Sequence, residues 1–356
     1  KLLDMMYIIK KDVYKDKKGA IKVYEKYLKN NYSYDVYTTY SKLLSEDGNE
    51  SKSVDIKEML TKYFPYDPGG FNNLSEYYFG IKKYDKAEDY IRKALAISPY
   101  NEEYWSQLGN IKSEKKEKPA AMEAYNKSLQ YDPNQYEVIN QIRKLNGKQE
   151  FYKIVPESDV QKIIKADDQS KAKNTDYGYY YIHDQKDVIF YPEGATEEYS
   201  TIIIKITNEK GVDRYKESSI GYSSTQNLLI EKAEVIKKNQ TRLEGERDGN
   251  QIVFSNLEVG DVLVFKYRTQ SFVYGRFSKE FWDKYYFGGQ IYSATTRYNF
   301  LAPASLKLYY EFRNSDLKPV IKDIENFKMY SWELINPAPL KDEPLMPVLA
   351  DVGAVL

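Results

Sequence analysis

The chain has 356 residues, with 53 basic and 53 acidic side chains and 42% hydrophobic residues. This length allows two or three domains with buried cores, and the balanced charge argues against a nucleic-acid-binding protein. The sequence contains no Cys and one His, which excludes thiol catalysis, disulfides and Cys-rich zinc sites. We expect neither a cofactor nor a metal ion.

The chain begins with KLLDMMYIIKKD, a stretch too short and too charged for a signal peptide. It lacks an initiator Met, so we expect the natural N-terminus to lie further upstream. No stretch approaches the roughly 18–20 consecutive apolar residues of a membrane helix. The sequence therefore predicts no integral membrane segment.

The first part of the chain carries a pattern that recurs every 34 residues. The segment KALAISPYNEEYWSQLGNI stops at Ser-Pro and restarts with aromatic residues, because a proline ends one helix before the next begins. Prolines recur at Pro65, Pro99 and Pro133, and aromatic residues recur at Tyr37, Phe71 and Trp105. Four further pairs of equivalent positions are Leu74 and Leu108, Ala87 and Ala121, the large residues Ile91 and Tyr125, and the small residues Ala94 and Ser128. This helix–turn–helix pattern resembles the tetratricopeptide repeat.

The repeat extends toward the N-terminus. The stretch KGAIKVYEKYLKNN puts Ala20 and Tyr24 in second-helix positions, so we predict about four repeats over residues 1–134, the first two degenerate. The stretch NQYEVINQIRKLNG is predicted to be a capping helix that ends at Gly147. Residues 1–147 are therefore predicted to form an α-helical tetratricopeptide solenoid.

Stacked repeats form a superhelix whose concave face is lined by residues of the first helix of each repeat. The candidates for this groove are Thr38, Lys42, Asn72, Asn73, Glu76, Ser106 and Asn110. Asn is a poor helix former, which favours a role for its amide in hydrogen bonding to an extended peptide. The alternative is that Asn72 and Asn73 cap a helix or face solvent. The solenoid predicts a protein or peptide ligand.

After Gly147 the helical period ends. Residues 148–174 predict a linker with one short helix from Ser158 toward Ala166. Further on, the period switches to two, with hairpins expected at residues 208–211 and 247–250. Residues 175–347 are thus predicted to form an antiparallel β-sandwich, followed by a tail over residues 348–356.

Several stretches of this β region occur in an informative order: IIIKITNEKGVDRY, LLIEKAEVIKKN, DGNQIVFSNLEVGDVLVFKYR, FWDKYYFGGQIYSATTRYNFLAPASLKLYYEF and YSWELINPAPLKDEPLMP. Together they resemble the domain of unknown function that precedes transglutaminase-like cores in bacterial proteins, often from Bacteroidetes and often combined with tetratricopeptide repeats. Members often carry His where this chain has Ile202 or Ile203. The resemblance implies an exported, periplasmic protein, with a cytoplasmic one as the alternative. It also implies that the tail leads to a downstream core.

Such a core would carry Cys, His and Asp, because its chemistry needs a thiolate activated by an imidazole. This chain has no Cys, so no transglutaminase or thiol-protease activity can reside in these residues. We therefore expect a non-catalytic binding scaffold with an adaptor β domain, the accessory region of a larger transglutaminase-like protein.

Two further features have competing interpretations. No nucleophile or second imidazole accompanies His183, so we expect this side chain to face solvent or lie in a turn. An aromatic cluster surrounds the stretch FWDKYYFGG, where Trp282, Tyr285 and Tyr286 are candidates for a surface that stacks on sugar rings or grips a partner. If these rings stack on sugars, the β domain is a carbohydrate-binding module, and its partner is a polysaccharide or another cell-envelope component. The alternative is that these rings fill the core of the sheet.

Overall fold

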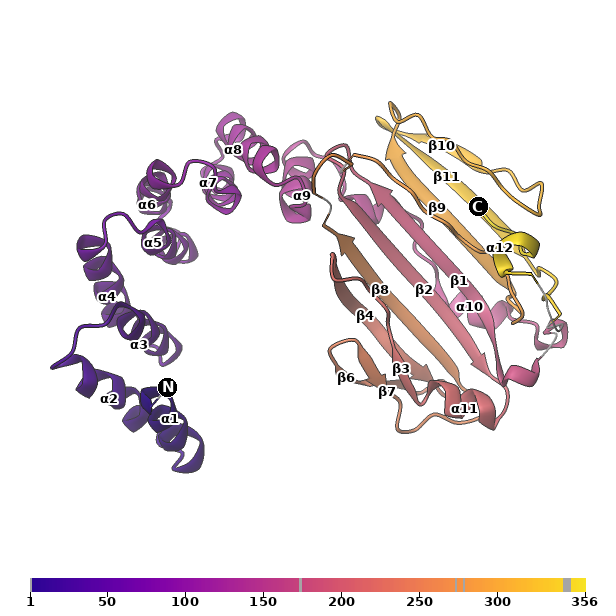
Figure 1. The fold of residues 1–356 in the computed structure, drawn as a ribbon, viewed down its shortest axis with the longest axis horizontal. Coiled ribbons are helices and arrows are strands. Elements are labelled where there is room, and N and C mark those ends of the chain that lie inside the picture. Colours follow the sequence, from indigo (N-terminus) through magenta and orange to yellow (C-terminus); the bar gives the residue numbers. More distant parts are fainter. Residues whose placement is uncertain (1, 173–174, 273, 278, 342–346) are drawn as a thin grey trace. The chain divides into compact units, whose positions relative to one another are not determined.

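The chain folds as two units, Lys1–Gly147 and Lys148–Leu356 (Figure 1). The computed structural model describes residues 2–172, 175–272, 274–277, 279–341 and 347–356. Residues 173, 174 and 342–346, which belong to the predicted linker and β domain, lie outside the described residues.

Residues 2–147 form four helical pairs and a closing helix. The elements are α1 (Leu2–Ile8), the π-helical turn η1 (Ile9–Val13) and α2 (Lys17–Leu28); α3 (Tyr34–Glu46) and α4 (Glu50–Tyr63); α5 (Pro68–Gly80) and α6 (Tyr84–Ile97); α7 (Glu102–Glu114) and α8 (Lys118–Tyr131); and α9 (Tyr136–Leu145). Consecutive helices pack against one another, as expected for a solenoid in which each repeat contacts only its neighbours.

The 34-residue period is visible in the backbone as well as in the side chains. Gly48, Lys82 and Lys116 are spaced 34 residues apart, and all three have φ between 59° and 81°, the left-handed conformation that ends the first helix of a pair. The start of the first helix of a pair is also set by local chemistry. Asn101, for example, accepts a hydrogen bond from the amide of Tyr104 at 2.9 Å and so caps α7.

Small residues mark the level at which the two helices of a pair cross. The Ser75 hydroxyl donates to the carbonyl of Ala87 at 2.9 Å, and both residues are fully buried. One period later, Gly109 lies against the buried ring of Tyr125. A side chain larger than these would hold the helices apart, which explains why the pattern requires a small residue there.

The second unit is built on a sheet of eight strands with a smaller sheet of three. The strands are β1 (Tyr179–Phe190), β2 (Thr196–Ile206), β3 (Glu217–Ser219), β4 (Gln226–Ile236), β5 (Arg242–Glu244), β6 (Glu246–Asp248), β7 (Gln251–Val253), β8 (Val262–Ser271), β9 (Thr295–Pro303), β10 (Val320–Ile324) and β11 (Phe327–Ile335). The large sheet has the order β10-β11-β9-β1-β2-β8-β4-β5, and the small sheet has the order β3-β7-β6 (Figure 1).

A solenoid followed by a β domain is the predicted fold class, and it is confirmed, but two details differ. The large sheet is mixed rather than antiparallel, because β1 and β9 run parallel, with Asp187 opposite Asn299. The predicted hairpin at 247–250 forms between β6 and β7. The hairpin predicted at 208–211 is wrong. Asn208 accepts from the amide of Lys210 at 2.9 Å and caps a helix, α11 (Glu209–Tyr215).

Both faces of the central strands of the large sheet are largely buried. Ile203 and Ile204 are adjacent on β2 and almost fully buried, yet they pack in different clusters. One cluster includes α10 (Val160–Ala166), which lies in the segment predicted to be a linker. The other face of the sheet packs against the small sheet and against the aromatic segment around residue 285.

The predicted tail also packs into the second unit. The helix α12 (Leu349–Val352) precedes Val355, which is 4% exposed and bridges to both Tyr286 and Arg313. The predicted linker and tail residues that the structure describes therefore contribute to the second unit.

Candidate functional site

A groove of about 630 Å³ lies among α3, α4 and α5 of the first unit. Four of the residues predicted for the concave face line it, namely Thr38, Lys42, Asn73 and Glu76. In the described part of the chain, neither the Lys42 amine nor the Asn73 amide has a hydrogen-bond partner or an ion pair. The Lys42 amine and the Asn73 amide are thus free to contact a ligand.

Two of the other predicted residues have internal roles. Asn72 donates from its amide to the Glu76 carboxylate at 2.8 Å, which makes it a helix-surface pair rather than a cap. Asn110 accepts from the hydroxyl of Tyr125 at 2.8 Å, which ties α7 to α8. Neither these two residues nor Ser106 is among the residues that line the groove.

Glycines deepen the groove, and the sequence analysis did not identify them. Gly70 and Gly80 both line it, and a Cβ on Gly80 would meet no atom within 4 Å. Tyr77 also lines the groove, and the Lys57 amine lies 5.7 Å from the centre of its ring. Glycine is unfavourable inside a helix, and this cost was the signal that could have identified Gly70 and Gly80.

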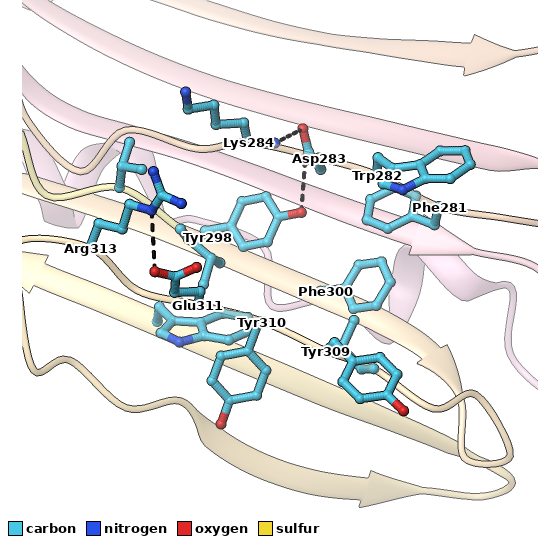
Figure 2. Close-up of a pocket in the computed structure, with 14 residues that line it drawn as sticks. Phe281, Trp282, Asp283, Lys284, Tyr298, Phe300, Tyr309, Tyr310, Glu311 and Arg313 are labelled. Carbon is cyan, nitrogen blue, oxygen red and sulfur yellow. Dashed lines mark hydrogen bonds and ion pairs between the residues drawn. The ribbon is translucent and has the colours of Figure 1, made fainter. Parts of the chain in front are cut away.

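A second cavity, of about 360 Å³, lies in the β domain and is walled largely by aromatic rings (Figure 2). Tyr298 and Phe300 of β9 and Trp332 of β11 contribute to it, together with side chains of residues 281–284 and 308–313. The Phe281 ring stacks on Phe300 with centroids 4.7 Å apart. Residues 306–314, predicted as part of the sheet, instead form an extended segment beside it with one bridge at Arg313.

Of the three aromatic surface candidates, only Trp282 lines this cavity. Its side chain is 73% exposed. Tyr285 is partly buried and donates its hydroxyl to the carbonyl of Asp184 at 3.3 Å. Tyr286 is also partly buried, with the Lys284 amine 5.3 Å from its ring centre. Of the rings at positions 281, 282, 285, 286 and 287, only that of Trp282 is therefore exposed.

The polar side of the cavity is ordered by a network behind it. Asp283 accepts from the hydroxyl of Tyr298 at 2.7 Å and forms an ion pair with Lys186 at 2.9 Å. Burial and the neighbouring Asp283 raise the pKa of Tyr298 well above its usual value. Tyr298 therefore stays protonated and keeps donating to Asp283, which fixes the segment that carries Trp282.

His183 is buried, so the expectation that it faces solvent or lies in a turn is wrong. It is 2% exposed on β1, and its Nε2 lies 3.2 Å from the Ser158 hydroxyl and 3.0 Å from the Gln185 carbonyl oxygen. Ser158 donates to that same oxygen at 2.6 Å. Burial lowers the pKa of His183, so it is neutral.

This buried polar row does not form a nucleophile–base pair. The Gln185 amide nitrogen donates to both oxygens of Asp187, at 2.9 and 2.7 Å, so its carbonyl oxygen faces Ser158 and His183 and can only accept. His183 Nε2 therefore carries the proton and has no lone pair for the serine. Burial raises the pKa of Asp187 to about 6, although hydrogen bonds from Asn299 and Gln185 lower it. The row is a structural network.

The described residues contain no group of three or more His, Cys, Asp or Glu side chains placed to hold a metal ion. Within the same part of the chain, no helix combines the length and apolar character needed to cross a membrane.

The fold and the repeat pattern define a tetratricopeptide solenoid joined to a mixed β-sheet domain. Residues 69–101 and 102–135 match the tetratricopeptide repeat. Residues 192–250 and 247–341 match the Domain of Unknown Function with solved-structure structure (DUF3857). The chain therefore carries tetratricopeptide repeats followed by a DUF3857 domain over these matched residues. No functionally curated protein matches it.

Solved structures resemble parts of the chain. A candidate protease from Parabacteroides distasonis has a TM-score of 0.45 and 16% identity over 50% of this chain, which spans 39% of that protein. MamA from Desulfovibrio magneticus RS-1 has a TM-score of 0.34 and 15% identity over 37% of this chain and 75% of its own. The first tetratricopeptide domain of Spaghetti (RPAP3), bound to the HSP90 peptide SRMEEVD, has a TM-score of 0.30 and 23% identity over 32% of this chain and 89% of its own.

Proposed function

We propose that the chain is a non-catalytic scaffold whose repeats bind an extended peptide or protein segment in the groove among α3, α4 and α5. The observation that carries the proposal is the free Lys42 amine and Asn73 amide in a groove deepened by Gly80. An extended peptide has backbone carbonyls that both groups can donate to, and it has side chains that fill the apolar part. The family resemblance supports a DUF3857 domain that serves as the accessory region of a larger transglutaminase-like protein.

A steric block of the groove tests this function. A Cβ on Gly80 meets no atom within 4 Å, so Gly80→Phe adds a ring at the groove, and it is expected to lower the affinity for selected peptides at least tenfold. Gly80→Ala is the matched control and should bind like the wild type. Peptides would be selected from a random library on the whole chain, and their affinities measured by calorimetry for all three proteins.

The outcome is decisive in either direction. Failure of the library to yield any peptide with micromolar affinity would contradict the proposal. Equal affinities for Gly80→Phe and Gly80→Ala would also contradict it, because the peptides would then bind elsewhere.

The family resemblance also supports export to the periplasm, which we propose for the full-length protein. Fractionation of the native host by osmotic shock would locate it, and recovery with the cytoplasmic fraction would contradict this part of the proposal.

Carbohydrate binding in the aromatic cavity is a second candidate function. Trp282 is 73% exposed and lines this concave aromatic cavity, which favours carbohydrate binding. Stacking of its solvent-exposed indole on a ligand ring would bury apolar surface and stabilise the complex. Trp282→Ala is expected to weaken the binding of neutral pyranosides roughly tenfold, as measured by calorimetry. The control is Tyr274→Ala, because Tyr274 is 69% exposed but does not line the cavity. Equal effects of both changes would refute the candidate.

A further inference from the structure

The aromatic cavity has two chemically different ends. Figure 2 shows the rings of Trp282, Phe300 and Tyr309 toward one end and the side chains of Glu311 and Arg313 toward the other. Trp282 and Tyr309 are 73% and 77% exposed, so both have ring surface available for a ligand. The volume of about 360 Å³ lies at the small end of the range for ligand pockets. This size suits one or two rings of a small molecule.

The charged end is held in place by the backbone. The amide of Arg313 donates to the carbonyl of Val355 at 2.7 Å, and the amide of Val355 donates back to Arg313 at 3.1 Å. Glu311 accepts from Nε of Arg313 at 3.3 Å. This bond uses one nitrogen and one oxygen, so in the described part of the chain the remaining guanidinium N–H groups and the second carboxylate oxygen have no partner.

We propose that this cavity recognises a neutral pyranose through both ends at once, an inference that rests on the second candidate function. The apolar face of the sugar ring lies against Trp282 or Tyr309. Two adjacent hydroxyl groups reach the Glu311–Arg313 pair, one donating to the carboxylate and the other accepting from the guanidinium. A hydroxyl can both donate and accept, so a pair of opposite charges suits a diol.

The same pair disfavours charged ligands. An anionic ligand would meet the Glu311 carboxylate, and a cationic ligand would meet the Arg313 guanidinium. Of the other charged side chains that line the cavity, Asp283 is paired with Lys186, and the Lys284 amine lies 5.3 Å from the centre of the Tyr286 ring. Selectivity for a neutral ligand therefore comes from leaving both members of the Glu311–Arg313 pair partly unsatisfied.

The test uses calorimetry on the whole chain with methyl glucoside, methyl galactoside, methyl mannoside and methyl N-acetylglucosaminide as probes. For the best probe, we expect Glu311→Gln to weaken binding roughly tenfold. Glu244→Gln is the matched control, because Glu244 at the end of β5 forms a similar pair with Arg247 of β6 at 3.0 Å, away from the cavity, and should bind like the wild type. Removing one of two adjacent hydroxyls from the probe should cost about as much as Glu311→Gln.

Four outcomes separate the inference from the function it rests on. Loss of binding in Glu311→Gln and in Trp282→Ala, with Glu244→Gln unchanged, supports both. Loss in Trp282→Ala alone overturns the inference and leaves carbohydrate binding in place. Tighter binding of glucuronate by Glu311→Gln than of any neutral sugar by the wild type overturns the inference in favour of an anion site. Absence of binding by all four probes at millimolar concentration overturns both.

Discussion

Replacing Gly211 with alanine is expected to destabilise the β domain by roughly 3 kcal/mol or more. A Cβ at this buried position would lie 1.9 Å from the carbonyl oxygen of Gly178 and 2.7 Å from its carbonyl carbon. The obstacle is backbone, so no rotamer change relieves it. The Gly178 carbonyl also accepts the amide of Thr207 at 2.8 Å, and moving it away would break that hydrogen bond.

The matched control is Gly221→Ala. Gly221 is exposed, and a Cβ there would meet no atom within 4 Å, so we expect a change within about 0.5 kcal/mol. Hydrogen exchange resolved along the sequence would measure the two units separately. The Gly211→Ala chain should lose protection in residues 175–335 and keep it in α5 to α8. Equal protection in the two variants would show that the Gly178 and Gly211 backbones can separate at little cost.

Replacing Glu88 with glutamine is expected to lower the stability of the helical unit by roughly 2–3 kcal/mol at neutral pH. Glu88 of α6 accepts from Lys112 at 2.8 Å and Lys115 at 2.9 Å, both at the end of α7, and it also pairs with Arg92. Lys112 is only 8% exposed. Without the carboxylate, its buried charge keeps one partner, Glu117 at 2.6 Å, instead of two. Urea unfolding followed by the helical circular dichroism signal measures this loss.

The same carboxylate predicts how stability depends on pH. Burial raises the pKa of Glu88, but hydrogen bonds from Lys112, Lys115 and Arg92 outweigh burial and lower the pKa to about 2, from an ordinary value of 4.5. The folded state therefore binds the proton more weakly than the unfolded state. The contribution of Glu88 to the free energy of unfolding is complete above pH 4.5 and is lost as the pH falls toward 2. The difference in stability between the wild type and Glu88→Gln should therefore shrink over that range.

A second glutamate serves as the control for this network. Glu123 forms an exposed pair with Lys127 at 3.3 Å within one helix, so Glu123→Gln should cost less than about 0.5 kcal/mol at any pH. A Glu88→Gln effect no larger than the Glu123→Gln effect would mean that Lys112 finds water in place of the carboxylate.

The repeats were predictable because their contacts are local. The positions of Leu74, Ala87, Ile91 and Ala94 follow from a fixed period, and all four are fully buried. Groove prediction was less complete. Counting along the first helices identified Lys42 and Asn73, but it also selected Asn110, whose amide is used by Tyr125. Counting residues along a helix predicts which face of the helix a side chain lies on. It does not predict which side chain of a neighbouring helix will form a hydrogen bond with it.

In the β domain, the two-residue alternation of side chains predicted where strands occur, but it did not predict which strands pair with one another. Nothing in the sequence near Asp187 indicates that Asn299 runs parallel beside it, because the two are brought together by pairing across 112 residues. The burial of His183 has the same origin. The segment around Ser158 lies over β1, and a single strand does not reveal which segment covers it.

The sequence by itself determined the 34-residue solenoid, the switch to strands and the exclusion of cysteine chemistry, because each depends on residue type or on short-range spacing. Tertiary structure alone decided the mixed sheet, the buried row at His183 and the two-ended cavity. Trp282, Tyr309, Arg313 and Trp332 share no period, and they meet at one cavity because strand pairing and the bridge to Val355 bring distant segments together. Such pairings depend on the burial of whole faces, a property that no local stretch of sequence contains.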